Sequence, residues 1–158
     1  MSNTFPTLQA RNLLGQSYTL PDDFKGVQNV ALVAFQRWHQ FLVDEWVAGL
    51  APLRERYPDL HVYEIPVMSQ FYMLARSFID GGMAMAIGSA EVRKHTLTVY
   101  TDVWQVRDDL GLPDTRTIGA FLVGPGGQVG WRAQGAFAPE QAKVLEEVLL
   151  SNSGAKVE

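Results

Sequence analysis

The sequence predicts an α/β domain in which helices flank a central mixed sheet. Three observations support this: a continuous apolar run at residues 30–35, a helix-spaced apolar stripe after it, and a hairpin near the C-terminal end. A short apolar run is typical of a strand buried on both faces of a parallel sheet, and parallel strands joined through helices place helices on those faces. The closing hairpin and helix argue against a uniformly parallel nucleotide-binding fold, and no G-x-G-x-x-G follows a strand.

The N-terminal half is predicted to contain a hairpin, two central strands and a long helix. Two short mixed runs between Leu8 and Leu20 flank a turn in which Gly15 can adopt positive φ. The first central strand covers Asn29 to Phe35, and the second covers Leu60 to Val67. A stripe at three- and four-residue spacing predicts a helix over Gln40–Arg56, which Pro58 ends. Its apolar residues are Phe41, Leu42, Trp46, Leu50, Leu53 and Tyr57.

The C-terminal half is predicted to begin with a helical insertion before the third central strand. The insertion covers Ser69 to Lys94, and Gly81-Gly82 is expected to separate two helices within it. The later elements are a strand at Leu97–Tyr100, a helix at Val103–Leu110, a hairpin of Ile118–Val123 and Gln128–Arg132, and a helix at Pro139–Leu150. We expect residues 1–150 to form one domain and residues 151–158 a flexible C-terminal tail.

Composition excludes several classes of function. The 158 residues contain no cysteine, which excludes disulfides, thiolate nucleophiles and cysteine-based zinc sites. Three histidines are too few for a dense histidine metal site, so no metal or other cofactor is predicted. The net charge of −4 and the scattered arginines predict no nucleic-acid partner. No apolar stretch is long enough to span a membrane, and Met1 to Arg11 lacks signal-peptide features, so we expect a cytoplasmic protein.

Two stretches resemble known families. The start contains Phe5-Pro6, Leu13-Leu14-Gly15-Gln16, Leu20-Pro21 and Phe24-Lys25-Gly26, and it resembles the opening of peroxiredoxins and other redoxins of the thioredoxin-like superfamily. The end contains Leu110-Gly111-Leu112, Gly119-Ala120-Phe121-Leu122-Val123 and Val129-Gly130-Trp131-Arg132 before Gly135. It resembles the thioredoxin-like domain of the mitochondrial ATP synthase assembly factors, which show a Leu-Val-Asp strand, an Ile-Arg-Trp strand and a Gly. Gly124 departs from that Asp, and Trp131-Arg132 inverts the Arg-Trp order. The resemblance implies a thioredoxin-like fold.

The residues that carry thiol chemistry in the redoxin active site are absent from this sequence. In redoxins, the nucleophilic Cys lies just after the first central strand, at the N-terminus of the next helix. Gln40 and Val43 stand about where a C-x-x-C pair would lie. Ile118 or Gly119 stands where the facing cis-proline would lie. Both halves of the thiol-handling site are therefore missing, and no catalytic residue is assigned.

The same region could still bind a ligand. Arg37, His39 and Asp44 cluster beside a helix N-terminus, a favourable place for an anion, and His39 would titrate near neutral pH. In the alternative, Arg37 and Asp44 form an exposed ion pair while Trp38 and His39 pack the helix start. Glu64 and Asp102 stand near strand C-termini, where α/β sheets place ligands, although Asp102 could simply cap a helix. The candidate binding residues here are Arg37, Trp38, His39, Gln40, Asp44, Glu64 and Asp102.

The segment from Met68 to Ile87 is the most distinctive part of the chain. It holds four of the five methionines, and methionine adapts to varied binding surfaces. Met73, Met83 and Met85 are candidate partner-binding residues, with Gly81-Gly82 as a hinge for a lid or a binding helix. In the competing interpretation, Phe71, Leu74 and Phe78 form the core face of a helix.

Three hypotheses follow from the sequence. A redox-inactive binding or assembly factor with a protein partner requires an exposed apolar patch in Met68 to Ile87. A small-anion or carboxylate binder or enzyme requires Arg37, His39 and Glu64 to converge on one pocket. The third hypothesis is a homodimer.

Overall fold

A mixed sheet of seven strands organises residues 3–157, which are the residues that the computed structural model describes. The strand order is β2-β1-β5-β4-β3-β6-β7. The strands are β1 Leu8–Asn12, β2 Ser17–Leu20, β3 Gln28–Ala34, β4 Leu60–Ser69, β5 Leu97–Thr101, β6 Gly119–Val123 and β7 Val129–Gln134. The α-helices are α1 Gln40–Arg56, α2 Arg76–Ala86, α3 Ala90–Lys94, α4 Val103–Asp109 and α5 Pro139–Val157. Short 3-10 helices cover η1 Arg37–His39, η2 Gln70–Ala75 and η3 Pro125–Gly127.

The three central strands run in the same direction. β4 pairs in parallel with β3 on one side and with β5 on the other, while β6 pairs antiparallel with β3. The hairpins β1–β2 and β6–β7 extend the sheet at its two edges. Because parallel strands end at the same edge, the segments that follow β3, β4 and β5 all start there. The predicted α/β class, N-terminal hairpin and closing hairpin are confirmed.

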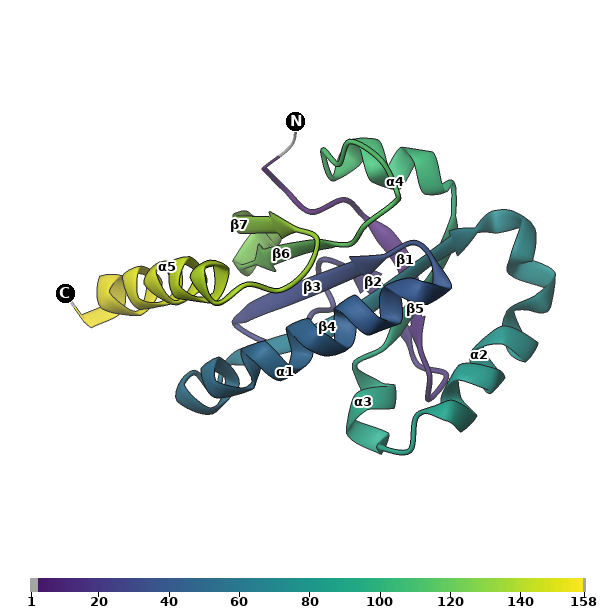
Figure 1. Ribbon diagram of the computed structural model, residues 1–158, viewed down its shortest axis with the longest axis horizontal. Coiled ribbons are helices and arrows are strands. Elements are labelled where there is room, and N and C mark those ends of the chain that lie inside the picture. The colour runs from purple at the N-terminus through teal and green to yellow at the C-terminus, as the bar shows by residue number, and fades with distance from the viewer. Residues whose placement is uncertain (1–2, 158) are drawn as a thin grey trace.

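Helices cover both faces of the sheet (Figure 1). α1 and α5 share one face, where Trp46, Leu50 and Leu145 are fully buried against the even-numbered residues of β3. α4 covers the other face and contributes Val106 to a cluster that includes Phe5. α2 lies beyond the start of α1, at the end of the molecule opposite to α5, and α3 lies between α2 and the sheet's lower side in the view of Figure 1.

The helical insertion differs from its prediction. Gly81-Gly82 lie inside α2 and do not separate two helices. The interruption instead falls at residues 87–89, where the guanidinium of Arg93 donates to the carbonyls of Ala84 (3.0 Å) and Ile87 (2.7 Å). A cation at the last carbonyls stabilises a helix C-terminus. The predicted break between two helices at Gly81-Gly82 is therefore wrong.

Two helices also differ in detail from the sequence pattern. α1 has the predicted bounds, but Phe41 is exposed and the buried stripe begins at Leu42. α5 continues past Leu150 to Val157, through most of the residues assigned to a flexible tail, and Glu158 lies outside the described residues. No helix in residues 3–157 is long and apolar enough to cross a membrane.

Candidate functional site

His39 is a buried structural residue at the N-terminus of α1. Its side chain is 0% exposed, and its Nδ1 accepts hydrogen bonds from the backbone N–H groups of Phe35 (3.0 Å) and Gln36 (3.2 Å). Two donors at Nδ1 place the ring proton on Nε2, which donates to the carbonyl of Arg116 at 3.1 Å. The imidazole is neutral and fully engaged with the backbone, so it is not presented to a ligand.

These contacts close the position of the redoxin active site. Arg116 lies in the loop before β6, two residues before Ile118, and Ile118 or Gly119 stands where the redoxin resemblance places the cis-proline. Gln36 makes a second link to this loop, because its Nε2 donates to the carbonyl of Thr115 at 2.9 Å. Side chains from the segment just after β3 and from η1 therefore bind the backbone of the facing loop and occupy this position.

Protonation of buried histidines should destabilise the fold. Burial lowers the pKa of His39 below its ordinary value of 6.5, and the hydrogen bond to Arg116 opposes this only in part. Burial also lowers the pKa of His61, and His95 and Arg54 add to that shift. Because both folded-state pKa values lie below 6.5, the unfolded chain binds protons first as the pH falls. The stabilisation is complete above about pH 6.5 and is lost progressively below it.

We expect the free energy of unfolding to decrease from about pH 7.5 to about pH 5, by up to about 1.4 kcal/mol per pH unit for each extra proton bound by the unfolded chain. Urea unfolding at several pH values measures this slope. His61→Gln serves as a matched variant. It should remove the contribution of His61 to this pH-dependent decrease in stability and keep the contribution of His39. If the free energy of unfolding of the parent chain does not change across this pH range, the lowered pKa values of His39 and His61 are contradicted.

Gln40, Asp44 and Glu64 form a small polar cluster beside η1. The Nε2 of Gln40 donates to Asp44 Oδ1 (2.8 Å) and to Glu64 Oε1 (3.2 Å), and so bridges the two carboxylates. Burial raises the pKa of Glu64, the hydrogen bond from Gln40 lowers it, and Asp44 raises it further. A site with two carboxylates and an amide does not attract an anion.

The predicted convergence of Arg37, His39 and Glu64 does not occur. The Arg37 side chain is exposed and makes no hydrogen bond or ion pair within residues 3–157, so the predicted Arg37–Asp44 pair is absent from this part of the chain. Trp38 is also exposed and packs edge-on against the His39 ring. Asp102 caps α4, where its Oδ1 accepts from the N–H groups of Trp104 (3.1 Å) and Gln105 (3.2 Å). The capping interpretation of Asp102 is confirmed.

A large group of apolar side chains is exposed along η2 and α2. Leu74 is 102% exposed, Phe71 and Met85 88% each, and Phe78 86%, so the expected core face of this segment points to solvent. Among the candidate methionines, Met73 and Met85 are exposed and Met83 is half-buried. We call the following six residues the η2–α2 surface: Phe71, Tyr72, Met73, Leu74, Phe78 and Met85.

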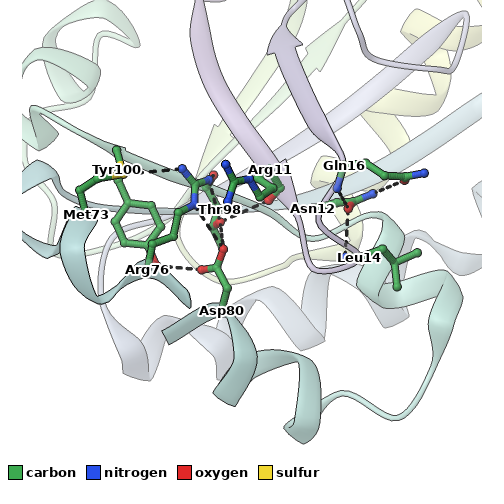
Figure 2. A network of polar contacts seen from close by, with 9 residues as sticks. All are labelled: Arg11, Asn12, Leu14, Gln16, Met73, Arg76, Asp80, Thr98 and Tyr100. Atoms are coloured by element: carbon green, nitrogen blue, oxygen red, sulfur yellow. Dashed lines mark hydrogen bonds and ion pairs between the residues drawn. The ribbon is translucent and has the colours of Figure 1, made fainter. Parts of the chain in front are cut away.

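The opposite face of α2 binds the sheet through a polar network (Figure 2). Asp80 accepts from Arg76 Nε (3.4 Å), Thr98 Oγ1 (2.9 Å) and the Tyr100 hydroxyl (2.8 Å). Arg76 also donates to the carbonyl of Thr98 at 3.0 Å, and its guanidinium lies 4.7 Å from the centre of the Tyr100 ring. The Arg76 and Asp80 side chains are only 14% and 13% exposed. Burial and the hydrogen bond to Asp80 raise the pKa of Tyr100, which therefore stays a donor.

The sheet beneath α2 explains this orientation. Thr98 and Tyr100 lie at alternate positions of β5, on the face that α1 covers elsewhere. Their hydroxyls need hydrogen-bond partners when buried. Arg76 and Asp80 supply them, and their position on the helix turns the apolar stripe of α2 outward. α2 is thus an amphipathic helix whose polar face is inside, which reverses the usual arrangement.

The roles of Arg76, Asp80, Thr98 and Tyr100 were not predicted from the sequence. The available signal was the alternation of Thr96, Thr98 and Tyr100, which places three polar groups on one face at β5 and just before it. The sequence also predicted no role for a further pair, His61 and His95, whose Nδ1 and Nε2 atoms lie 3.4 Å apart beside a groove of about 450 Å³. No group of three or more His, Asp or Glu able to hold a metal is found within residues 3–157.

Solved structures similar to this chain share its whole architecture. BsSco, described as a member of the Sco family of cytochrome c oxidase assembly proteins, matches with a TM-score of 0.62 and 12% identity, over 97% of this chain and 95% of that one. The thioredoxin domain of a thiol-disulfide oxidoreductase from Bacteroides vulgatus matches with a TM-score of 0.59 and 17% identity, over 93% and 97%. The chain has a thioredoxin-like fold.

Other comparisons qualify the thioredoxin-like assignment. Yeast Sco1, solved with copper bound, matches with a TM-score of 0.60 and 11% identity, over 94% of each chain. At these identities the likeness establishes the fold alone. No protein-family model and no curated protein sequence matches the chain. This thioredoxin-like chain contains no cysteine, so it performs no cysteine-dependent redox chemistry.

Proposed function

We propose that this thioredoxin-like protein is a redox-inactive binding or assembly factor that holds a protein partner on the η2–α2 surface. The observation that carries the proposal is the reversed orientation of α2, whose polar face binds the sheet while Leu74, Phe78 and Met85 face solvent. Contiguous exposed apolar side chains of this extent mark interaction sites. The assembly role is supported by the Sco-family neighbour and by the resemblance to ATP synthase assembly factors.

The alternative, a small-anion or carboxylate binder at the former active site, has less support. His39 is turned into the protein and bound on both ring nitrogens, and Arg37 does not approach it. The polar cluster nearby is built around Glu64 and Asp44, which would repel an anionic ligand. A homodimer is compatible with the same exposed surface.

Affinity capture from native lysate tests the proposal. The immobilised protein is compared with the variant Leu74→Ser/Phe78→Ser/Met85→Ser, and with Val144→Ser/Leu150→Ser as a control for exposed apolar residues on α5. Because all five side chains are largely exposed, both variants should unfold within about 1 kcal/mol of the parent chain. We expect a specific protein whose recovery falls at least about tenfold with the first variant and is unchanged with the control. If no captured protein depends on these three side chains, the proposal is wrong.

A further inference from the structure

We propose that a second copy of this chain covers the η2–α2 surface when no partner is bound, through antiparallel packing of the two α2 helices about a two-fold axis. The inference rests on the proposed function, because both occupants use the same surface. It adds a regulatory step to that function: a partner must displace the second copy. Three properties of the surface support the inference: its area, its lack of charge and the spacing of its exposed residues along the chain.

The exposed area is the amount that a specific dimer needs. A wholly exposed aromatic side chain presents roughly 150–250 Å², so the six residues together offer on the order of 800 Å² of apolar surface. A standard interface buries about 800 Å² on each partner, whereas the largest apolar patch of a typical monomer measures about 300–600 Å². The η2–α2 surface therefore reaches the size of an interface.

The surface contains no free charge. Between residues 70 and 89 the only charged side chains are Arg76 and Asp80, and these bind each other on the inner face of the helix. A two-fold interface brings each patch against its own copy, so an unpaired charge near the axis would face the same charge. An uncharged patch suits a second copy. It also lacks the exposed basic residues that would attract an anionic membrane.

The exposed stripe is complementary to itself in the antiparallel direction. Within α2, Phe78, Gly81 and Met85 follow one another at spacings of three and four residues, which is the spacing of a coiled-coil seam, and Leu74 lies four residues before Phe78 in η2. The pattern is symmetric about a point between residues 79 and 80. An axis there places Phe78 opposite Gly81 of the second copy and Leu74 opposite Met85.

Gly81 provides the space that this pairing requires. A Cβ added at Gly81 would meet no atom within 4 Å, so the exposed side of the helix is open at this residue. An aromatic ring opposite a glycine allows two helix backbones to approach closely. Large side chains then alternate with small ones across the axis, as close packing between helices requires.

Paired charge substitutions at Leu74 and Met85 test the geometry as well as the association. Sedimentation equilibrium over a dilution series measures the dimer dissociation constant. Leu74→Glu/Met85→Glu places like charges opposite each other and should weaken the dimer about 100-fold or more. Leu74→Lys/Met85→Glu places opposite charges across an antiparallel axis and should recover at least about tenfold of that loss. Circular dichroism checks that both variants fold.

Several outcomes would overturn the inference. The inference is wrong if the parent chain stays monomeric throughout the dilution series. It is also wrong if the parent chain dimerises but the Lys/Glu variant has no lower dimer dissociation constant than the Glu/Glu variant. A monomer that instead floats with phosphatidylcholine–phosphatidylserine vesicles through Phe78 assigns the surface to a membrane. The capture experiment is read separately: a monomer with surface-dependent capture overturns only the dimer. A dimer without surface-dependent capture overturns only the proposed function.

Discussion

Replacing His39 by leucine should lower the free energy of unfolding by about 2–4 kcal/mol. The substitution leaves the N–H groups of Phe35 and Gln36 and the carbonyl of Arg116 without the partner they have in the folded chain. A buried polar group that loses its partner costs about 1–3 kcal/mol, and water can reach the exposed Gln36 more easily than the other two. The loss is large because typical domains are stable by only about 5–15 kcal/mol.

Urea unfolding of the His39→Leu variant measures this effect. Arg37→Ala is the matched control, since the Arg37 side chain is exposed and makes no hydrogen bond within the described residues; it should change stability by less than about 0.5 kcal/mol. His39→Gln, which can both accept and donate, should recover part of the loss. The leucine variant should also lose the His39 share of the stability change between about pH 7.5 and about pH 5. Unchanged stability in His39→Leu would contradict the structural role.

The sequence predicted those elements that local chemistry determines. The bounds of α1 follow from its apolar spacing and from Pro58, and the role of Asp102 follows from its place one residue before a helix. Gly15 adopts the positive φ that the first hairpin turn requires. The packing of His39 at the start of α1 was one of the alternatives that the sequence left open. Each of these inferences needed only neighbouring residues.

The orientation of α2 could not be predicted in this way. Arg76 and Asp80 are spaced i,i+4, which on sequence grounds is typical of an ion pair on an exposed helix face. Whether that pair points outward or inward depends on Thr98 and Tyr100, which stand 18 and 20 residues after Asp80. The core interpretation of Phe71, Leu74 and Phe78 failed for this reason. Helical periodicity shows that a face exists, but the sheet beneath decides which face is buried.

Replacing one partner of the Arg76–Asp80 pair should lower the free energy of unfolding substantially, whereas replacing both partners together should lower it much less. Asp80→Leu leaves the buried Arg76 guanidinium without its carboxylate and removes the acceptor of the Tyr100 hydroxyl. Removal of one partner of a buried pair costs about 3–5 kcal/mol. Because α2 lies at the end of the sheet, the segment can undock before the whole fold opens, so we expect about 2–4 kcal/mol. Hydrogen exchange of the α2 amides, together with urea unfolding, separates local from global loss.

The double variant Arg76→Met/Asp80→Leu completes a double-mutant cycle. A hydrophobic pair of similar volume often matches the stability of a buried ion pair, so the double variant should recover most of the loss. The exposed Arg56–Glu146 pair, 3.0 Å apart, provides the control cycle and should couple by less than about 1 kcal/mol. Additive losses at Arg76 and Asp80 would show that the two residues do not act together.

The double variant also distinguishes two roles of the Arg76–Asp80 pair, stabilising the fold and directing the apolar face of α2 outward. With both charged side chains replaced by apolar ones, the inner face of α2 becomes apolar and no longer makes the hydrogen bonds that direct it toward Thr98 and Tyr100. Either face can then pack against the sheet, and the outward direction of Leu74 and Phe78 is no longer specified. We expect a variant that recovers most of the stability lost in Asp80→Leu, but whose capture of a partner and whose self-association fall together. If both activities survive at full strength, the Arg76–Asp80 pair serves stability alone, and the outward orientation of α2 has another cause.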